Sequence, residues 1–392
     1  MAKPVIVSAV RTAIGRSFKG ALANVPSETL ATTILPEAVR RAGIDPAAVD
    51  DVILAELNYG GGDLARHAAV AAGMLTVPGQ AVNRHCTGSL TAIGNGAAHI
   101  VSGMERVIVA GGVQSLSTAP LMKWRVPGRA ELEFVEPWMP PSHPETPDAP
   151  TLDMAITVGW NTAKKAGISR AEMDAWALRS HQRAVAAIDA GKFVDEIVPM
   201  KVQQLDGSVL DFAVDEFPRR DTTLERLAAL PVLHPEIEGF SITAGNSSGI
   251  NDAAAAVTLV GDDYAAVEGL EVLGTVRAWA NAAVTPADNG LAAGKVIGKI
   301  LDRAGLQPAD VALWEINEAF ASVPIAACRE HGLDEDLVNF SGSGCSLGHP
   351  ISASGARMVT TLLYELRRRG GGIGVAAMCA GGGQGGALIV EV

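Results

Sequence analysis

Apolar runs along the chain are short and alternate with amphipathic segments, a pattern typical of strands that alternate with helices. The runs are rich in Val and Ile, as in Val52–Leu57 and Arg106–Gly112, and small residues surround them. Such strands fit sheets that are buried on both faces, so the pattern predicts an α/β fold with mostly parallel sheets. Because helices rich in Ala and Gly can approach one another closely, we also expect a central helical layer between two sheets.

The same strand–helix unit occurs twice in the sequence. Residues 38–49 (AVRRAGIDPAAV) and 300–311 (ILDRAGLQPADV) match at a constant offset. In both copies an amphipathic helix ends at a glycine, a turn with a proline follows, and a strand begins. Each copy then continues through a polar or glycine-rich loop into a helix, expected at Leu90–Ser102 and at Ala353–Arg368. The sequence therefore predicts two related α/β halves that pack together.

The segment between the two copies has a different character. It contains a proline-rich stretch at 137–150, a strand pattern at Glu196–Val202, and a helix start at Ser169, where Ser169-Arg-Ala-Glu172 matches a capping box. A long insertion of this kind is either a surface elaboration or a lid, and its helix and strand patterns argue against disorder. The predicted organisation is an N-terminal half at 1–117 completed by 252–269, an inserted loop domain at 118–251, and a C-terminal half at 270–392.

Composition and charge exclude several classes of function. The chain has 392 residues and a formal net charge of −12, so it lacks the excess of cations that nucleic-acid binding requires. Its apolar runs are far shorter than the roughly 20 residues of a membrane span, and its first residues lack a signal-peptide layout, so we expect a cytoplasmic protein. The four cysteines lack CxxC spacing, which argues against a zinc site or a disulfide scaffold.

Cys86 is a candidate nucleophile. It lies between the end of a predicted strand and the start of a helix of small residues. Unpaired N–H groups and the helix dipole at such a position favour a thiolate, although a lone cysteine is more often a small buried apolar residue. The neighbouring His85 would point the opposite way if the strand continues, so we interpret it as structural.

Three further positions carry candidate chemistry. His349 lies in a glycine-rich loop that corresponds, in the second copy, to the Cys86 loop, and a Cys–His pair is the smallest unit that forms a thiolate at neutral pH. The glycine run after Cys379 could cradle a phosphate, but it lacks the P-loop residues; it could instead present backbone N–H groups as an oxyanion hole beside a second thiol. Asn317 is either a helix N-cap or a side chain that holds a water against a substrate oxygen.

Together and in order, these motifs resemble those of the thiolases, the family of acetyl-CoA acetyltransferases and 3-ketoacyl-CoA thiolases. The resemblance runs from Val5 to Val392 and is carried by Arg11-Thr-Ala-Ile-Gly15, the Cys86 loop, Gly111-Gly112, Thr243-Ala-Gly-Asn246, Asn251-Asp252, Asn317-Glu-Ala-Phe320, Gly348-His-Pro350 and Cys379-Ala-Gly-Gly-Gly383. It implies duplicated α/β/α layered halves with an inserted loop domain. It also implies thiolytic cleavage of a 3-ketoacyl-CoA, or the reverse Claisen condensation, through an acyl-Cys86 intermediate.

The resemblance also implies a role for each site residue. Cys86 carries the acyl group, His349 takes the Cys86 proton, and Cys379 is the acid and base at the α-carbon of acetyl-CoA. One oxyanion hole would use His349 and a water held by Asn317, and the other would use the amides of Cys86 and Gly381. The expected contacts to CoA or substrate are Met154, Arg219 or Arg220, Ser248, Gly249, Ala319 and Phe320. CoA and acyl-CoA would be substrates, with no permanently bound cofactor or metal, and a homodimer or homotetramer is expected.

The chain departs from the family pattern at several positions. These are Thr87-Gly88-Ser89 after the nucleophile, Ser341, Ser343, Ser346 and Ser352 around the His349 loop, and Asp153, near Trp160, in place of a histidine. Two alternatives stay open. A decarboxylating ketoacyl synthase-like enzyme would pair its cysteine with two histidines or with His and Asn, whereas the third position here is a thiol. A non-catalytic acyl-CoA-binding protein is favoured only by the serine substitutions. We interpret Cys328 as a core residue and Cys345 as a packing residue, with a redox role as the alternative for Cys345.

Overall fold

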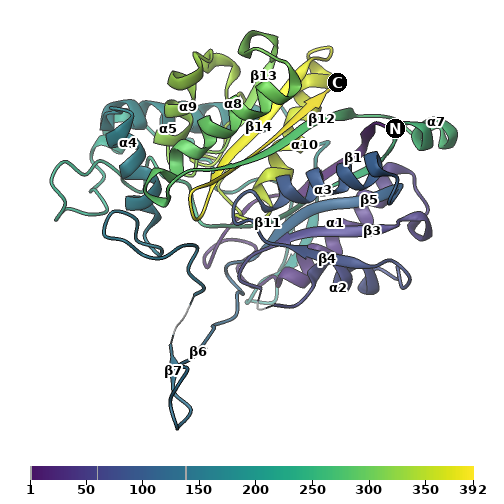
Figure 1. Ribbon diagram of the computed structural model, residues 1–392, viewed down its shortest axis with the longest axis horizontal. Helices are drawn as coiled ribbons and strands as arrows, with labels where there is room; N and C mark the ends of the chain where they lie inside the picture. Colours follow the sequence, from purple (N-terminus) through teal and green to yellow (C-terminus); the bar gives the residue numbers. More distant parts are fainter. Residues whose placement is uncertain (1, 60, 137–138) are drawn as a thin grey trace.

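The computed structural model describes residues 2–59, 61–136 and 139–392. Its main strands form two half-sheets, ordered β4-β3-β5-β11-β1 and β12-β15-β14-β13 (Figure 1). The half-sheets join where β1 meets β12 at Val5–Thr275 and Ile6–Gly274. The strands of the first half are β1 (Pro4–Thr12), β2 (Gly15–Arg16), β3 (Asp51–Glu56), β4 (Gly79–Val82), β5 (Val107–Gln114) and β11 (Asn251–Gly261). Those of the second half are β12 (Gly274–Ala283), β13 (Leu313–Ile316), β14 (Ile373–Ala380) and β15 (Gln384–Glu391).

Helices surround and separate these sheets. The first half carries α1 (Ser27–Ala42), η1 (Pro46–Ala48), α2 (Leu64–Ala71), α3 (Gly88–Ser102) and α7 (Asp262–Glu268). The second half carries η3 (Pro286–Leu291), α8 (Ala292–Ala304), η4 (Pro308–Asp310), α9 (Ser322–His331), η5 (Glu335–Leu337) and α10 (Ser354–Arg368). The predicted helices at Leu90–Ser102 and Ala353–Arg368 therefore begin within two residues of the observed starts.

The predicted duplication is confirmed. Helices α1 and α8 both end at a glycine in the left-handed region, Gly43 (φ 70°) and Gly305 (φ 66°). A proline-led turn follows each, and then strand β3 or β13 begins. Strand β3 pairs in parallel with β4 and β5, and β13 pairs in parallel with β14 and with Val338.

The expectation of mostly parallel sheets is wrong. Strand β11 is antiparallel to both of its neighbours, β1 and β5, and β15 is antiparallel to both β12 and β14. In the second half the cause is the short turn at residues 381–383, because strands joined directly by a tight turn must run in opposite directions. The equivalent pair in the first half, β5 and β11, flanks the insertion.

The predicted central helical layer is confirmed. Helices α3 and α10 contribute Ile93 and Leu362 to one buried cluster that also contains strand residues of both halves. The helices approach closely, because a Cβ on Gly355 would lie only 2.6 Å from Leu90 Cγ. Figure 1 shows both helices where the two halves meet. This layer positions the candidate site, since Cys86 lies two residues before α3 and His349 lies five residues before α10.

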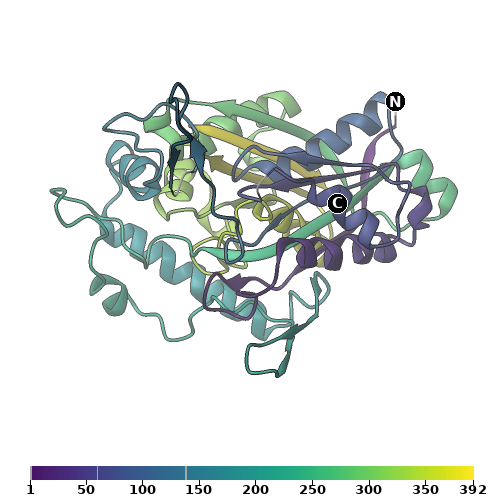
Figure 2. The same ribbon diagram turned by 90° about the horizontal axis from the view of Figure 1, so that it is seen from below.

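The inserted segment packs along one side of the halves and also sends out a long arm, residues 121–136, that contains β6 and β7 (Figures 1 and 2). The capping box predicted at Ser169 and Glu172 is present at the start of α5. The strand expected at Glu196–Val202 is interrupted at Pro199, which has no N–H to donate to a ladder. Residues 137 and 138 of the proline-rich stretch lie outside the described residues. The elements of this segment are β6 (Trp124–Arg125), β7 (Phe134–Val135), η2 (Ala155–Trp160), α4 (Asn161–Lys165), α5 (Arg170–Asp189), β8 (Ile197–Val198), β9 (Met200–Gln203), β10 (Val209–Phe212) and α6 (Leu224–Ala228).

A buried ion cluster attaches the insertion to the first half. Arg11 of β1 donates to Glu196 at 2.7 Å and to Asp215 at 2.7 and 2.9 Å, and all three side chains are almost fully buried. Both carboxylates belong to the insertion. Within the described part of the chain, no helix is long and apolar enough to cross a bilayer.

Candidate active site

The Cys86 and His349 loops lie beside each other because α3 and α10 meet at their first turns. The Ala356 N–H of α10 donates to Ser89 Oγ of α3 at 3.0 Å. Strand β5 lies equally close to the loop before α10, since a Cβ on Gly112 would lie 1.9 Å from the Ser352 carbonyl oxygen. The two halves thus bring the nucleophile loop and the histidine loop to one place, as packing about a pseudo-twofold axis predicts.

Cys86 is partly buried in a tight turn, in which the Gly88 N–H donates to the His85 carbonyl at 2.9 Å. The Gly381 N–H donates to the thiol, which favours the thiolate. Burial nevertheless raises the pKa of Cys86 to about 11. The N–H groups act in the predicted direction, but the loss of water outweighs them. Cys86 needs a base.

His349 is placed to be that base. Its backbone N–H donates to Asn251 Oδ1 at 3.1 Å, and its Nδ1 lies 2.6 Å from Ser354 Oγ. Gly348 before it has a φ of 101° and no room for a Cβ, so only glycine fits this approach to Asn251. Burial, aided by the charge of Arg357, lowers the pKa of His349 to about 3. The imidazole is therefore neutral near pH 7 and can accept a proton.

Asn317 lies over the His349 ring, with its Nδ2 at 3.5 and 3.4 Å from the two ring nitrogens. The N-cap of α9 is Ala321, so the interpretation of Asn317 as a helix cap is wrong. The fully buried Asn317 Oδ1 has no hydrogen-bond partner among the described residues. A buried carbonyl oxygen in this position is suited to accept from a water or a substrate group, which supports the other interpretation.

A second thiol lies beside the first. Cys379, at the end of β14, is buried, and burial raises its pKa above the ordinary range. A thiolate at Cys86 would raise the pKa of Cys379 further, because the two thiols are close enough to interact electrostatically. Gly381 follows after one residue and presents its N–H to Cys86. This end of β14 thus supplies both a thiol and a backbone donor.

His85 lies nearer the site than the sequence predicts. Its φ of 46° places it in the left-handed region, where the turn breaks the alternation of a strand. The ring lies against Gly381, where a Cβ would be 3.2 Å from its Cγ. The interpretation that His85 points away from the site is therefore wrong. Because glycine has no side chain, the ring can pack on the backbone that faces Cys86.

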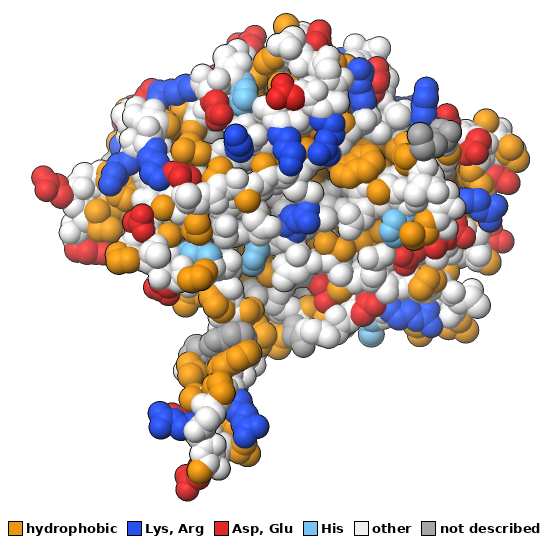
Figure 3. Space-filling model, viewed as in Figure 1, with side chains coloured by type: hydrophobic (Ala, Val, Ile, Leu, Met, Phe, Trp, Pro, Cys, Tyr) orange, Lys and Arg blue, Asp and Glu red, His pale blue; other side chains and the backbone are white. Residues whose placement is uncertain are grey.

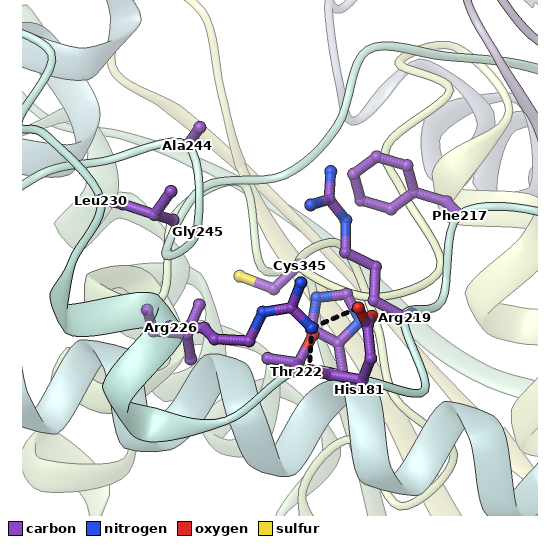
Figure 4. A pocket seen from close by; sticks show the side chains of 11 residues that line it. His181, Phe217, Arg219, Thr222, Arg226, Leu230, Ala244, Gly245 and Cys345 are labelled. Atoms are coloured by element: carbon purple, nitrogen blue, oxygen red, sulfur yellow. Dashed lines mark hydrogen bonds and ion pairs between the residues drawn. The ribbon is translucent and has the colours of Figure 1, made fainter.

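A cavity of about 220 Å³ opens between the insertion and the His349 loop (Figure 4). Arg219, Arg226, His181 and Cys345 are among its lining residues. The other candidate arginine, Arg220, is turned to the surface, where it pairs with Asp189 at 2.6 Å. The structure therefore favours Arg219 over Arg220 as a ligand contact. Arg226 also faces the cavity, paired with Asp221, and no motif in the sequence marked it.

The other predicted contacts lie against one another or against residues of the insertion. The Ser248 N–H donates to the Ala319 carbonyl at 2.9 Å, so the two motifs run side by side. A Cβ on Gly249 would lie 2.5 Å from the ring of Phe217, a cavity-lining residue. Phe320 packs against Gly159 of η2, the helix that begins directly after Met154. None of these four predicted positions (Ser248, Gly249, Ala319 and Phe320) is itself among the described residues that line the cavity.

Most residues that depart from the family pattern form hydrogen bonds or ion pairs with other residues of this chain. Asp153 pairs with His234 at 2.8 Å and accepts from the Ala155 N–H at 3.1 Å, which anchors the start of η2. Ser343 Oγ accepts from Arg357 at 3.0 Å, and Ser352 Oγ donates to Gln114 at 3.1 Å. Ser346 Oγ lies 2.7 Å from Ser180 Oγ of the insertion, whereas Ser341 Oγ has no partner among the described residues. Three of the four serines around the His349 loop, Ser343, Ser346 and Ser352, are thus hydrogen-bonded to buried polar groups.

The two remaining cysteines are buried. Cys328 packs in the second core cluster from α9, which confirms its interpretation as a packing residue. Cys345 packs in the same cluster and also lines the cavity, with its thiol 3.8 Å from the Glu318 carbonyl oxygen. Among the described residues, no group of three His, Cys, Asp or Glu side chains could hold a metal ion.

Comparison with known proteins places this site in a family. Residues 4–263 match the family model described as "Thiolase, N-terminal domain", and residues 270–392 match "Thiolase, C-terminal domain". An acetyl-CoA acetyltransferase of Pseudomonas aeruginosa is 41% identical, and a beta-ketoadipyl-CoA thiolase of the same species is 40% identical, each over 98% of both chains. A crystal structure of the Bacillus anthracis acetyl-CoA acetyltransferase superposes with a TM-score of 0.91 at 38% identity, covering 100% of this chain and 99% of that one. The chain belongs to the thiolase family.

Proposed function

We propose that this protein is an acyl-CoA:acetyl-CoA C-acyltransferase, which cleaves 3-ketoacyl-CoA with CoA or runs the reverse Claisen condensation. The observation that carries the proposal is the pair of neighbouring thiols, Cys86 and Cys379, beside a neutral buried His349. One thiol can carry an acyl group while the other moves a proton at carbon. The names of the relatives support this activity. They favour neither a decarboxylating synthase nor a non-catalytic binding protein.

In the condensation direction, the first half-reaction loads Cys86. His349 Nε2 takes the thiol proton, and the Cys86 thiolate attacks the acetyl-CoA carbonyl. The His349 imidazolium and a water held by Asn317 stabilise the oxyanion. The C–S bond to CoA then breaks, Cys379 gives its proton to the CoA thiolate, and acetyl-Cys86 and a Cys379 thiolate remain.

The second half-reaction forms the carbon–carbon bond. The Cys379 thiolate removes a proton from the α-carbon of a second acetyl-CoA, and burial suits it to this task because a thiol of raised pKa gives a more basic thiolate. The carbanion attacks acetyl-Cys86, while the N–H groups of Cys86 and Gly381 stabilise the oxyanion. Collapse releases 3-ketoacyl-CoA, and His349 returns the proton to Cys86. Thiolysis is the same sequence in reverse.

The inserted domain, assigned to 118–251, would hold CoA. Arg219 and Arg226 place two guanidinium groups at the cavity between this domain and the catalytic halves, and guanidinium groups pair well with phosphates. A local pair of cations is what a chain of net charge −12 needs to bind a polyanionic substrate. The 1–117 segment with 252–269, and the 270–392 segment, would form the two catalytic halves.

We further propose a homodimer or homotetramer in a reducing, cytoplasmic compartment, working in fatty-acid and lipid metabolism, including β-oxidation. The arm exposes apolar side chains such as Leu121, Leu132 and Phe134, at 90%, 69% and 47%, well away from the halves (Figure 3). Such a surface is typical of subunit contacts. The four cysteines lack the spacing of a disulfide scaffold, which suits a reducing compartment. Sedimentation of a variant without residues 121–136 tests the oligomer: a lower oligomeric state supports the proposal, and an unchanged one rejects the arm as the contact.

Turnover tests the function directly. The purified protein is incubated with free CoA and a panel of straight-chain, branched and dicarboxylic 3-ketoacyl-CoA esters, and loss of the enolate absorbance is followed. The proposal expects turnover of at least one ester, abolished in Cys86→Ala and retained in Cys328→Ala, a buried thiol outside the site. Absence of turnover across the panel, with CoA binding intact, would overturn it.

A further inference from the structure

Ser354 is the first residue of α10 and contacts the candidate base directly. It is fully buried, and its Oγ lies 2.6 Å from His349 Nδ1. The same hydroxyl donates to the Pro350 carbonyl, one helical turn earlier, at 2.9 Å. The first contact is short for a nitrogen–oxygen hydrogen bond and the second has an ordinary length, so one hydroxyl joins the helix start to the imidazole.

The chemistry of these groups determines where the hydrogens lie. A serine hydroxyl has one hydrogen, and a carbonyl oxygen can only accept. The Ser354 hydrogen therefore points to Pro350, and the lone pair of Oγ faces His349. A short contact of that lone pair with Nδ1 requires Nδ1 to carry the imidazole hydrogen. In the neutral ring Nε2 is then unprotonated and can accept a proton.

No other contact in this part of the chain sets the tautomer. Asn317 Nδ2 is almost equally distant from the two ring nitrogens, so it does not point along the lone pair of either one. Arg357, one turn further along α10, acts on the His349 charge alone. It is held by Glu315 at 2.8 Å and by Ser343 at 3.0 Å, and its charge disfavours the imidazolium.

We propose that Ser354 is a positioning residue that holds His349 as the Nδ1–H tautomer and so leaves Nε2 free to take the Cys86 proton. The proton transfer rests on the function proposed above, whereas the tautomer is a property of the resting protein. Loss of the hydroxyl releases Nδ1. The ring then redistributes between tautomers, and the form that can accept the Cys86 proton becomes a minor one.

The test compares three variants. Ser354→Ala removes the contact, and Ser354→Thr keeps the hydroxyl. Thr360→Val is the matched control, because Thr360 is buried on the same helix and donates to the carbonyl four residues back at 2.9 Å, without contacting His349. We expect Ser354→Ala to lower kcat about 10- to 100-fold with little change in the KM for CoA. Thr360→Val should stay near the wild type, and Ser354→Thr should recover most of the loss.

Two readouts separate positioning from folding. The first is the rate of Cys86 alkylation by iodoacetamide against pH, which should fall near neutral pH in Ser354→Ala and not in Thr360→Val. The second is the nitrogen-15 spectrum of histidine-labelled protein, with His349 assigned by its absence in His349→Asn. The wild type should show a protonated Nδ1, and Ser354→Ala should not. An Nε2-protonated His349 in the wild type, or equal kinetics in Ser354→Ala and Thr360→Val, would overturn the inference. The tautomer is measured without turnover, so a failure of the proposed function is recognised separately.

Discussion

At the scale of single residues, burial controls the chemistry of the candidate site. The same loss of water that raises the pKa of Cys86 to about 11 lowers that of His349 to about 3. Both groups are therefore neutral in the resting protein. Charge separation between them becomes favourable when an acyl-CoA carbonyl is present to accept the developing negative charge.

The buried histidine makes folding stability depend on pH. The His349 pKa is lower in the folded chain than its ordinary 6.5, so the unfolded chain binds the extra proton. Its stabilising contribution is complete above pH 6.5 and is lost as pH falls toward 3. At pH 5 the loss amounts to about 2 kcal/mol.

Urea unfolding at pH 7 and pH 5 measures this effect. We expect His349→Asn to lose less stability than the wild type over this interval. The comparison between the two proteins separates the histidine from Glu315, whose pKa burial raises to about 7 and which acts in the opposite direction. Equal pH dependence in both proteins would contradict the assignment of a neutral buried His349.

The second thiol should be needed for one half-reaction more than for the other. We expect Cys379→Ser to lower the rate of condensation about 10²- to 10⁴-fold, because a hydroxyl is a poor acid and base at carbon. Acylation of Cys86 by acetyl-CoA, followed by mass spectrometry, should persist. Equal loss of acylation and condensation would contradict the role of Cys379 at carbon, because its only proposed role in acylation is to protonate the CoA that leaves.

The sequence motifs contain every candidate catalytic residue, yet they do not predict the pKa or the side-chain direction of these residues. The pKa of Cys86 depends on burial by segments far away in the chain, not on the helix start that follows it. The direction of the His85 ring depends on the left-handed backbone of His85 itself. That conformation is uncommon outside glycine, and an alternating strand pattern does not predict it. Local pattern therefore identifies the site, and tertiary packing sets its chemistry.

At the scale of elements, the site depends on the close approach of α3 to α10 and of strand β5 to the loop before α10. Gly112→Ala in β5 would place a Cβ 1.9 Å from the Ser352 carbonyl oxygen, so the two halves must move apart. We expect a loss of about 1–3 kcal/mol in stability and a lower kcat. Gly298→Ala on α8 is the contrast, because its Cβ would lie 3.3 Å from the edge of the His331 ring. Thermal unfolding and turnover of the two variants measure the difference, and similar behaviour would contradict the role of the close approach.

Of three arginines in the insertion, Arg219 and Arg226 line the cavity and Arg220 does not. Arg219→Ala and Arg226→Ala should each raise the KM for CoA about 10- to 100-fold with little change in kcat, because each removes a charged contact worth about 1.5–3 kcal/mol. Arg220→Ala is the matched control and should behave as the wild type, since Arg220 pairs with Asp189 at the surface. Steady-state kinetics with CoA as the varied substrate decide the matter. A raised KM in Arg220→Ala alone would reverse the assignment.

The element pattern predicted the repeat and the central layer but not the strand directions. Short apolar runs are the same in parallel and antiparallel sheets that are buried on both faces. The direction of β15 follows from the glycine turn before it, and the direction of β11 follows from where the insertion returns the chain. The sequence did not predict Arg226 as a cavity residue for a similar reason: the fold of the insertion, and not a local motif, brings Arg226 to the cavity.

At the scale of the whole molecule, the duplicated halves and the insertion contribute different parts of the candidate site. The halves provide two thiols, a neutral histidine and backbone donors at one point, and the insertion adds the cavity with its two arginines. The net charge of −12 argues against nucleic acid as a partner but is compatible with a polyanionic substrate held by a few local cations. Two buried networks, around Arg11 and around Glu318, fix the insertion to the halves.

The central claim is that Cys86 carries the acyl group. Its most direct test is peptide mass spectrometry of the protein after brief incubation with acetyl-CoA and rapid quenching in acid. The account predicts one added acetyl group, located on Cys86, absent in Cys86→Ala and still present in Cys328→Ala. An acetyl group on Cys379 or Cys345, or turnover with no acyl-enzyme on Cys86, would contradict it.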